Sequence, residues 1–302
     1  MAIPHPIPYQ GSKRNLAKYI LECMPNNVER IVEPFAGSAA ISIACADQKI
    51  GNHYWLNDIN EPLAKLLNKM ATNPNEVIRR YESIWNGQLE GDPKEHFNFI
   101  RSEFNNTHEP EMLLYLLARC VKNAVRYNEK GEFNQGPDNR RKGKNPIKMA
   151  RDIQGYVELL QNKLTVTSLD YVEVLRDTQN SDLIYMDPPY QGTKGSSKRY
   201  IQGLDFEKFI VALDDLNKRN IPYIISFDGS TGNKIYGSSL PDYLNLRRIN
   251  LNAGTSSQST LKGNPEQTIE ALYISKDVKI SEKKLKEIQY SSSPKQLSLE
   301  ID

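Results

Sequence analysis

The chain contains little of what disulfide-bonded, metal-binding or membrane-spanning proteins need. Its 302 residues include three cysteines and four histidines, and no apolar run is long enough to cross a bilayer. Because Cys23, Cys45 and Cys120 are widely spaced in apolar stretches, we expect them to be reduced core residues. The histidines are scattered without partners at ligand spacing, so we expect no metal. The amino terminus lacks a signal-peptide core, which favours a soluble, cytoplasmic protein.

Two glycine motifs that mark dinucleotide and triphosphate sites are also missing, namely GxGxxG and a P-loop ending in Gly-Lys-Ser/Thr. The chain instead has a predicted strand at residues 30–33, the turn Pro34-Phe35-Ala36-Gly37-Ser38 and a predicted helix from residue 39. A strand, a glycine turn and a helix make half of a nucleotide-binding βαβ unit. Gly37 permits close backbone approach, and the helix amino terminus offers free N–H groups to a ligand.

A second predicted strand, residues 53–58, ends in an acid, Asp58. An acid about twenty residues after the glycine turn commonly holds ribose hydroxyls. The alternative is that Asp58 caps the helix that starts near Glu61 and Pro62, and both roles are compatible.

Residues Asp187, Pro188, Pro189 and Tyr190 follow an apolar segment, 183–186, that is typical of a buried strand. Open α/β sheets bind ligands at the carboxyl ends of such strands. The carboxylate and a backbone carbonyl can accept hydrogen bonds from an exocyclic amine, and the ring of Tyr190 can stack on a nucleobase. A strand that runs into a proline turn is the alternative, and it explains the prolines but not the acid or the aromatic.

Together these motifs resemble, over roughly residues 8–275, the Dam family of S-adenosylmethionine-dependent DNA adenine-N6 methyltransferases. Further segments match in order: an amino-terminal motif with Gly-Ser-Lys for the usual Gly-Gly-Lys, an acid–aromatic pair at 170–171, and a closing strand at 268–274. The resemblance implies an α/β, Rossmann-like methyltransferase sheet with helices on both faces and an inserted helical target-recognition domain. It implies S-adenosyl-L-methionine as cofactor, bound by Tyr9, Gly11, Lys13, Glu33, Phe35, Gly37, Ser38, Asp58, Asp170, Tyr171 and Asp187.

Positive charge is concentrated in one part of a chain whose net charge is only +2. Residues 119–151 carry ten Lys and Arg against three Asp and Glu, which is typical of a surface that binds double-stranded DNA. A solvated loop is the alternative, but amide and aromatic groups such as Phe133 and Gln135 are interleaved with the cations. A second basic loop follows Tyr190. We expect DNA contacts from Lys122, Arg126, Asn128, Asn134, Arg140, Arg141, Lys198 and Arg199.

Residues 126–128 and 131–134 match the recognition hairpin of the same family. Arg126 suits a guanine, because its paired donors fit O6 and N7. Residues 121–124, however, lack the aromatic that GATC-specific members insert between bases, and Pro137 comes one place later than in those members. The match therefore does not imply GATC.

Apolar periodicity divides the chain into a first catalytic part (1–72), a helical recognition insertion (73–160), a second catalytic part (161–276) and a poorly packed tail (277–302). Predicted helices cover residues 62–71, 74–85, 93–104, 111–125 and 149–162. The fourth has an apolar stripe that includes Val121 and Val125, so we expect it to present Arg126 at its end.

The expected reaction is methylation of an adenine N6. That nitrogen lies inside the duplex, so the base must flip out at a cost of a few kcal/mol. Methylation of cytosine N4, RNA or protein glutamine is the main alternative, and Asp187 argues against it because such enzymes usually have Asn or Ser there. A DNA-binding module with an inactive fold is a second alternative, against which the intact motifs argue. A cognate restriction endonuclease is a partner that the sequence does not demonstrate.

Overall fold

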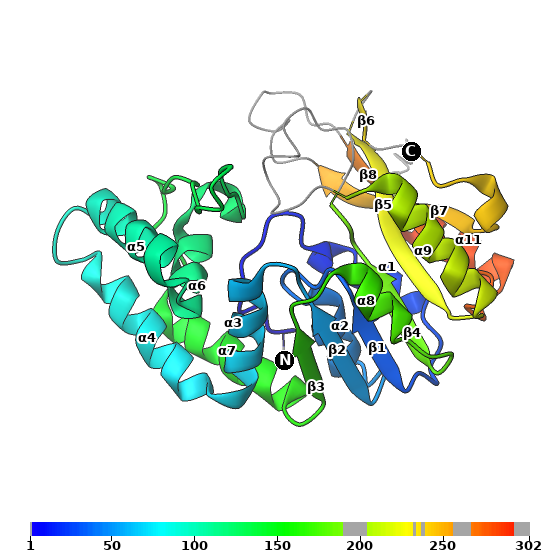
Figure 1. Ribbon diagram of the computed structural model, residues 1–302, viewed down its shortest axis with the longest axis horizontal. Helices are drawn as coiled ribbons and strands as arrows, with labels where there is room; N and C mark the ends of the chain where they lie inside the picture. The colour runs from blue at the N-terminus through cyan, green and yellow to red at the C-terminus, as the bar shows by residue number, and fades with distance from the viewer. Residues whose placement is uncertain (1, 190–203, 232–233, 237–238, 256–266, 293–302) are drawn as a thin grey trace, which may run out of the picture.

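The computed structural model describes residues 2–189, 204–231, 234–236, 239–255 and 267–292. Within them the chain forms an eight-stranded mixed sheet, with a cluster of helices beside one end of it (Figure 1). The strand order is β3-β2-β1-β4-β5-β8-β7, and β6 pairs with β5. The strands are β1 Arg30–Glu33, β2 His53–Asn57, β3 Leu164–Thr167, β4 Asp182–Met186, β5 Tyr223–Thr231, β6 Lys234–Tyr236, β7 Arg247–Thr255 and β8 Gln267–Ile274.

Strands β1 to β5 run parallel, whereas β8 is antiparallel to both β5 and β7. The order of the strands changes direction between β1 and β4. That reversal creates a crevice at the carboxyl ends of the two strands, where open α/β sheets bind ligands. The architecture confirms the predicted Rossmann-like methyltransferase sheet.

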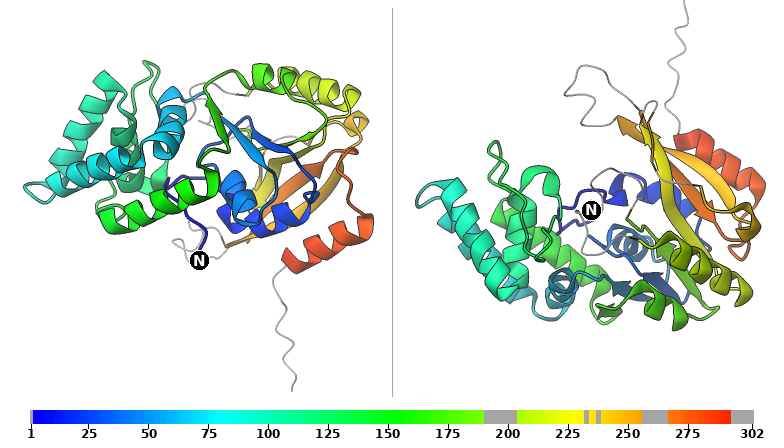
Figure 2. Two further views of the ribbon diagram at one scale, coloured as in Figure 1. Left: turned by 90° about the horizontal axis from the view of Figure 1, so that it is seen from below. Right: turned by 45° about the horizontal axis from the view of Figure 1, so that its top comes forward.

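Helices cover both faces of the sheet, which is why the central strands are apolar on both sides (Figures 1 and 2). Ile31 and Tyr185 share a core with α1, α2 and α11, whereas Val32 and Met186 share one with α8 and α9. The bounds are η1 Lys13–Asn15, α1 Ala17–Glu22, α2 Ala40–Asp47, α8 Tyr171–Arg176, α9 Phe206–Lys218, η4 Asp242–Leu244 and α11 Glu282–Ser292.

The helical cluster lies between β2 and β3 in the chain. Its helices are α3 Glu61–Thr72, α4 Pro74–Gly87, α5 Pro93–Thr107, α6 Pro110–Arg119 and α7 Pro146–Leu160, with η2 Val121–Asn123 after α6. Helices α4 to α7 each begin with a proline, which suits the first helical position because its missing N–H needs no partner there. Their buried side chains belong to the same core as one face of the sheet. The role of residues 73–160 in target recognition stays a prediction.

Helix α6 ends at Arg119, short of the predicted end at residue 125, so it does not present Arg126. Cys120 is extended, with φ −76° and ψ 164°, and Lys122 and Asn123 have positive φ angles of 61° and 54°. The Asn123 side chain donates to the Leu117 carbonyl at 2.8 Å and so satisfies a group at the helix end. The predicted apolar stripe fails here as well, because Val121 is 39% exposed.

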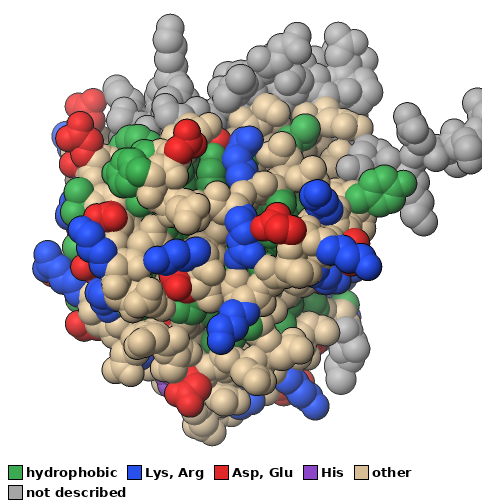
Figure 3. All heavy atoms as spheres, turned by 90° about the vertical axis from the view of Figure 1, so that its right-hand side faces the viewer, with side chains coloured by type: hydrophobic (Ala, Val, Ile, Leu, Met, Phe, Trp, Pro, Cys, Tyr) green, Lys and Arg blue, Asp and Glu red, His purple; other side chains and the backbone are tan. Residues whose placement is uncertain are grey.

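Residues 277–292 are not the poorly packed tail that composition predicted. Helix α11 packs against β7 and α1, and Leu285 and Ile288 are buried in the main core. The spacing of these two residues was a helical signal that the Lys, Glu and Ser content obscured. Figure 3 shows the side of the molecule that carries α9 and α11, where basic and acidic side chains are interspersed.

Candidate functional site

A pocket opens at the carboxyl ends of β1, β2 and β4, in the crevice that the strand order creates. Segments far apart in the sequence form its walls, including the amino-terminal motif, which runs between the helical cluster and the sheet (Figure 1). Among the predicted site residues, its lining contains Tyr9, Gly11, Lys13, Glu33, Phe35, Gly37, Ser38, Asp58, Asp170, Tyr171, Asp187, Pro188 and Pro189. All of the predicted cofactor residues therefore meet in one place.

The glycine turn is held to the Asp58 turn by a hydrogen bond. The Gly37 N–H donates to Asp58 Oδ2 at 2.9 Å, and the Asn60 N–H donates to Oδ1 at 2.9 Å. Gly37 has φ +51°, and a Cβ there would lie 3.2 Å from the Tyr9 ring. The N-cap of α3 is Asn60, so Asp58 braces the turn before the helix instead of capping it. Burial raises the pKa of Asp58, against the effect of these two donors.

Asn57, which no sequence motif singled out, joins the loops that follow β1, β2 and β3. Its side chain donates to the carbonyls of Pro34 and Leu169, both at 3.0 Å. It accepts from the Thr167 hydroxyl and the Leu169 N–H, both at 2.8 Å. The side chain is fully buried, and its whole hydrogen-bonding capacity is used within the wall of the pocket. In the sequence, the one indication of this role is the position of Asn57 near the end of a predicted strand, next to Asp58.

Asp187 is paired with the amino-terminal motif. Lys13 Nζ lies 2.8 Å from Asp187 Oδ1 and 3.7 Å from Oε2 of Glu270 on β8. Burial raises the pKa of Asp187 to about 6, although Lys13 acts to lower it, and Glu270 raises it further. Glu270 was not predicted to belong to the site. In the sequence, Glu270 stands out as an acid between the apolar residues Ile269 and Ala271 of a predicted strand.

Glu33 ends β1 and is almost completely buried. Its Oε1 accepts from the Ser42 N–H in the first turn of α2 at 2.7 Å. Burial raises the pKa of Glu33 to about 7; the hydrogen bonds from Ser42 lower it, and the nearby Asp187 raises it. A carboxyl group that titrates near neutral pH therefore lines the pocket beside Asp187.

Aromatic rings form another wall. The rings of Phe35 and Tyr171 lie 5.1 Å apart between centroids, and both approach Phe209 of α9. Asp170 caps α8 by accepting from the Val172 N–H at 2.9 Å, and its other oxygen is 3.2 Å from Lys208 Nζ. The predicted acid and aromatic, Asp170 and Tyr171, therefore both line this wall, which is an apolar surface with a carboxylate at its edge.

Residues 126–134 form a hairpin beside the amino-terminal motif. Tyr127 and Phe133 face each other across it and are buried, with ring centroids 5.9 Å apart. The Asn105 side chain on α5 accepts from the Phe133 N–H at 2.8 Å and donates to its carbonyl at 3.2 Å. Arg126 and Asn134, on the other side of the strands, are exposed. Phe133, expected among base-contacting groups, instead anchors the hairpin.

Most of the predicted DNA-binding side chains that the structure describes face outward, whereas one is hydrogen-bonded within the chain. The outward-facing, exposed ones are Lys122, Arg126, Asn134, Arg140 and Arg141, the last also paired with Asp138 at 2.7 Å. Asn128 is committed to the turn: its Oδ1 accepts from the N–H groups of Lys130 and Glu132, and its Nδ2 donates to Glu132 Oε2 at 2.7 Å.

Two cations of the basic stretch 119–151 are also bonded to groups within the chain. Arg119 is 4% exposed and donates to Gln88 and to the Asp138 carbonyl. Lys144 is paired with Asp152 and donates to the His5 carbonyl at 2.7 Å. The basic surface is therefore smaller than the residue count indicated. Tyr190, Lys198 and Arg199, three further predicted site residues, lie outside the described residues.

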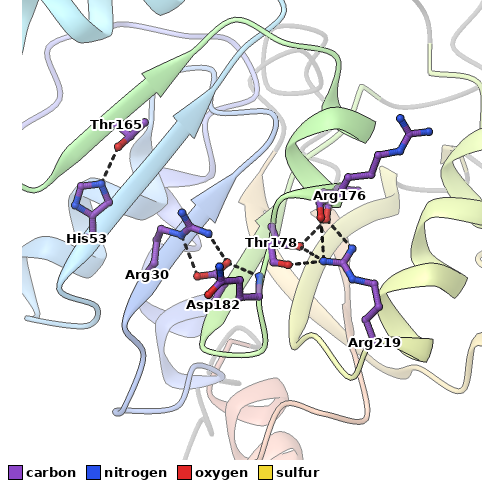
Figure 4. Close-up of polar contacts among 9 residues, drawn as sticks. Arg30, His53, Thr165, Arg176, Thr178, Asp182 and Arg219 are labelled. Carbon is purple, nitrogen blue, oxygen red and sulfur yellow. Dashed lines mark hydrogen bonds and ion pairs between the residues drawn. The ribbon is translucent and has the colours of Figure 1, made fainter.

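Another group of charged residues lies at the amino ends of the parallel strands, away from the pocket (Figure 4). Arg30 pairs with Asp182 through two hydrogen bonds of 2.9 and 2.7 Å. Arg219 donates to the carbonyls of Leu175, Arg176 and Thr178, around the end of α8. Both cations are hydrogen-bonded to groups within the chain, so we assign them to stabilising the fold.

The described part of the chain contains neither a cluster of metal-ligating side chains nor a disulfide. No group of three or more His, Cys, Asp and Glu side chains there could hold a metal ion. Cys23, Cys45 and Cys120 are free and buried, which confirms the prediction of reduced core residues. Within the same ranges, every helix is too short or too polar to cross a membrane.

Comparison with known proteins gives the family. The model of the D12 class N6 adenine-specific DNA methyltransferases matches residues 9–247. The Retron Ec67 DNA adenine methylase of Escherichia coli is 28% identical over 263 residues, 83% of this chain and 87% of that protein. The type II methyltransferase M1.LlaDCHI of Lactococcus lactis subsp. cremoris is 29% identical over 192 residues, 60% of this chain and 64% of that protein. The DNA adenine methylase of Serratia marcescens is 26% identical over 186 residues, 60% of this chain and 65% of that protein. With its fold, its pocket and a match over most of its length, the chain belongs to the D12 class of N6 adenine-specific DNA methyltransferases.

Proposed function

We propose that the pocket binds S-adenosyl-L-methionine and that Asp187 acts on an adenine N6 presented beside it. The half-buried Asp187 carboxylate, at the end of β4 in the wall of the pocket, is the observation that carries this proposal. The donor set fits the cofactor, since Glu33, Asp58 and Asp170 suit its ammonium and ribose hydroxyls, while Phe35 and Tyr171 suit its adenine. When bound, the cofactor supplies an electrophilic sulfonium methyl group.

Asp187 and the Pro188 carbonyl each accept one N6 hydrogen of the target base in this mechanism. The N6 lone pair is delocalised into the purine, so two acceptors that polarise the amine and aim its lone pair lower the barrier to in-line displacement. The carboxylate stabilises most as positive charge develops on N6, in the transition state. The target base reaches this position by flipping out of the duplex, and Tyr190 stacks on it.

We further propose that the hairpin of residues 126–134 selects the target sequence. Its buried side holds the hairpin against α5, and its exposed side carries Arg126, which can contact guanine O6 and N7. Lys122, Asn134, Arg140 and Arg141 supply further polar and basic groups to this surface, and Lys198 and Arg199, outside the described residues, are further candidates for phosphate contacts. GATC is not implied as the recognition site.

The decisive experiment incubates the chain with labelled S-adenosyl-L-methionine and mixed-sequence duplex DNA and then identifies the modified nucleoside. We expect N6-methyladenine, and its absence from every duplex would overturn the proposal. Asp187→Ala should transfer no methyl group, so retained activity in that variant would overturn the mechanism alone. RNA and a protein substrate serve as negative controls.

Mapping N6-methyladenine in the DNA of a bacterium that expresses the chain gives the recognition sequence. We infer a cytoplasmic location, because the substrate DNA lies there. A cognate restriction endonuclease would appear as an activity of the source cell that cuts the mapped sequence only when it is unmethylated.

A further inference from the structure

Glu270 of β8 lies beside the ion pair that Lys13 and Asp187 form in the wall of the pocket. Lys13, only 6% exposed, is 2.8 Å from Asp187 and 3.7 Å from Glu270, whose side chains are 22% and 17% exposed. Lys13 Nζ also lies 3.4 Å from the Gly11 carbonyl. One largely buried ammonium group is therefore shared between two carboxylates that come from strands β4 and β8.

Sharing matters because Asp187 must accept a hydrogen bond from the substrate. A carboxylate that is tightly paired with a lysine is a weaker acceptor, since the cation already stabilises its negative charge. Glu270, a second carboxylate near the same cation, weakens the stabilisation of Asp187 by Lys13. Glu270 also gives Lys13 an alternative partner when an amine approaches Asp187.

We propose that Glu270 is a positioning residue for methyl transfer, which holds Lys13 between two carboxylates and thereby keeps Asp187 a strong acceptor for the target amine. The inference rests on the proposed role of Asp187. Among the described residues, Glu33 on β1 and Tyr185 on β4 are further titratable groups that interact electrostatically with Asp187. In agreement, Glu270 raises the pKa of Asp187, whereas Lys13 lowers it.

The test is the pH profile of kcat for Glu270→Gln at saturating S-adenosyl-L-methionine and mixed-sequence DNA. We expect the acid limb to move to lower pH by about half a unit, because Asp187 loses a neighbouring negative charge. We expect the plateau to fall by roughly fivefold, because Asp187 becomes a weaker acceptor. A loss of packing alone would lower the plateau without moving the limb.

Two controls keep the outcomes separate. Glu270→Asp keeps the charge and should leave the acid limb at its wild-type position. Glu282→Gln removes an exposed acid on α11 and should change neither quantity. An unshifted limb in an active Glu270→Gln enzyme, or a limb displaced in Glu270→Asp, would overturn the inference. If Glu270→Gln does not fold, Glu270→Thr, which also removes the charge and suits a strand, takes its place with the same expected shift, and an unshifted limb there would overturn the inference. A wild-type enzyme that forms no N6-methyladenine would instead refute the proposed function.

Discussion

The hydroxyl of Tyr127 donates to Oδ1 of Asn60 at 3.2 Å, and this bond joins the hairpin to the pocket. Asn60 in turn donates through its N–H to Asp58, which also holds Gly37. A second link lies nearby, where the Gln10 N–H of the amino-terminal motif donates to the Asn123 carbonyl at 2.9 Å. The element proposed to contact DNA is thus bonded to the turns proposed to bind the cofactor.

Tyr127→Phe should uncouple the hairpin from the pocket, because it removes the hydroxyl and keeps the buried ring. In the wild-type protein, we expect S-adenosyl-L-methionine to slow amide exchange at Asn128 and Asn134 by about fivefold. In the variant this protection should largely disappear while exchange around Gly37 still slows. Tyr54→Phe, which removes a hydroxyl bonded to the Ile50 and Gly51 carbonyls, is the control. Equal hairpin protection in Tyr127→Phe and wild type would contradict the coupling.

Gly37→Ala should weaken cofactor binding by about tenfold or more, because φ +51° is strained for alanine and the added Cβ would press on Tyr9. Isothermal titration calorimetry with S-adenosyl-L-methionine measures the change. Gly91→Ala is the matched control, since a Cβ there meets nothing within 4 Å. Unchanged affinity in Gly37→Ala would show that the turn does not contact the cofactor.

Asn57→Leu should lower the free energy of unfolding by about 3 kcal/mol or more, because it leaves several buried donors and acceptors without partners. Urea denaturation followed by circular dichroism gives the value. Asn68→Leu on the exposed side of α3 should change the stability far less. A small effect at Asn57 would mean that water replaces its hydrogen bonds.

Glu33→Gln should stabilise the protein at neutral pH but not in acid. Because burial raises the pKa of Glu33 to about 7 in the folded state from its usual 4.5, the folded protein holds the proton more tightly than the unfolded chain. Wild-type stability therefore falls as pH rises from 4.5 to 7, by up to on the order of 3 kcal/mol, whereas the Gln variant lacks this loss. Thermal unfolding of both proteins across this range should show a gap that widens with pH and then levels off. A gap independent of pH would contradict the assignment.

Arg126→Lys should reduce kcat/KM by roughly tenfold to a hundredfold, because lysine cannot donate two parallel hydrogen bonds to a guanine. Sequencing of methylated positions should also show relaxed selection at one base pair. Arg140→Lys keeps a charge that we expect to contact phosphate only, so both activity and selectivity should change little. Selectivity preserved in Arg126→Lys would move guanine recognition to another residue.

Much of the site was predictable because its residues occupy fixed places in a local pattern. The strands ending at Glu33, Asn57 and Met186 are short apolar runs followed by polar turns, and parallel strands bring such turns to one edge of the sheet. The amino-terminal segment could be assigned to the pocket only by its resemblance to the family motif, because no local pattern indicates where it lies. The pocket lining then contained every predicted cofactor residue.

Neighbouring residues alone specify the short strands that end at Glu33, Asn57 and Met186, the proline starts of α4 and α5, and the acids at the strand ends. These features depend on residues close together in the chain. Which charged side chains remain available to a ligand depends instead on the tertiary structure. It pairs Arg119 and Lys144 with groups inside the chain, uses Phe133 and Asn128 to hold the hairpin, and ends α6 before Arg126. It also sets Glu270 beside Lys13 and Asp187, from three segments of the chain. Burial and pairing are properties of neighbours in space, and they set how strongly Asp187 accepts a proton or a hydrogen bond.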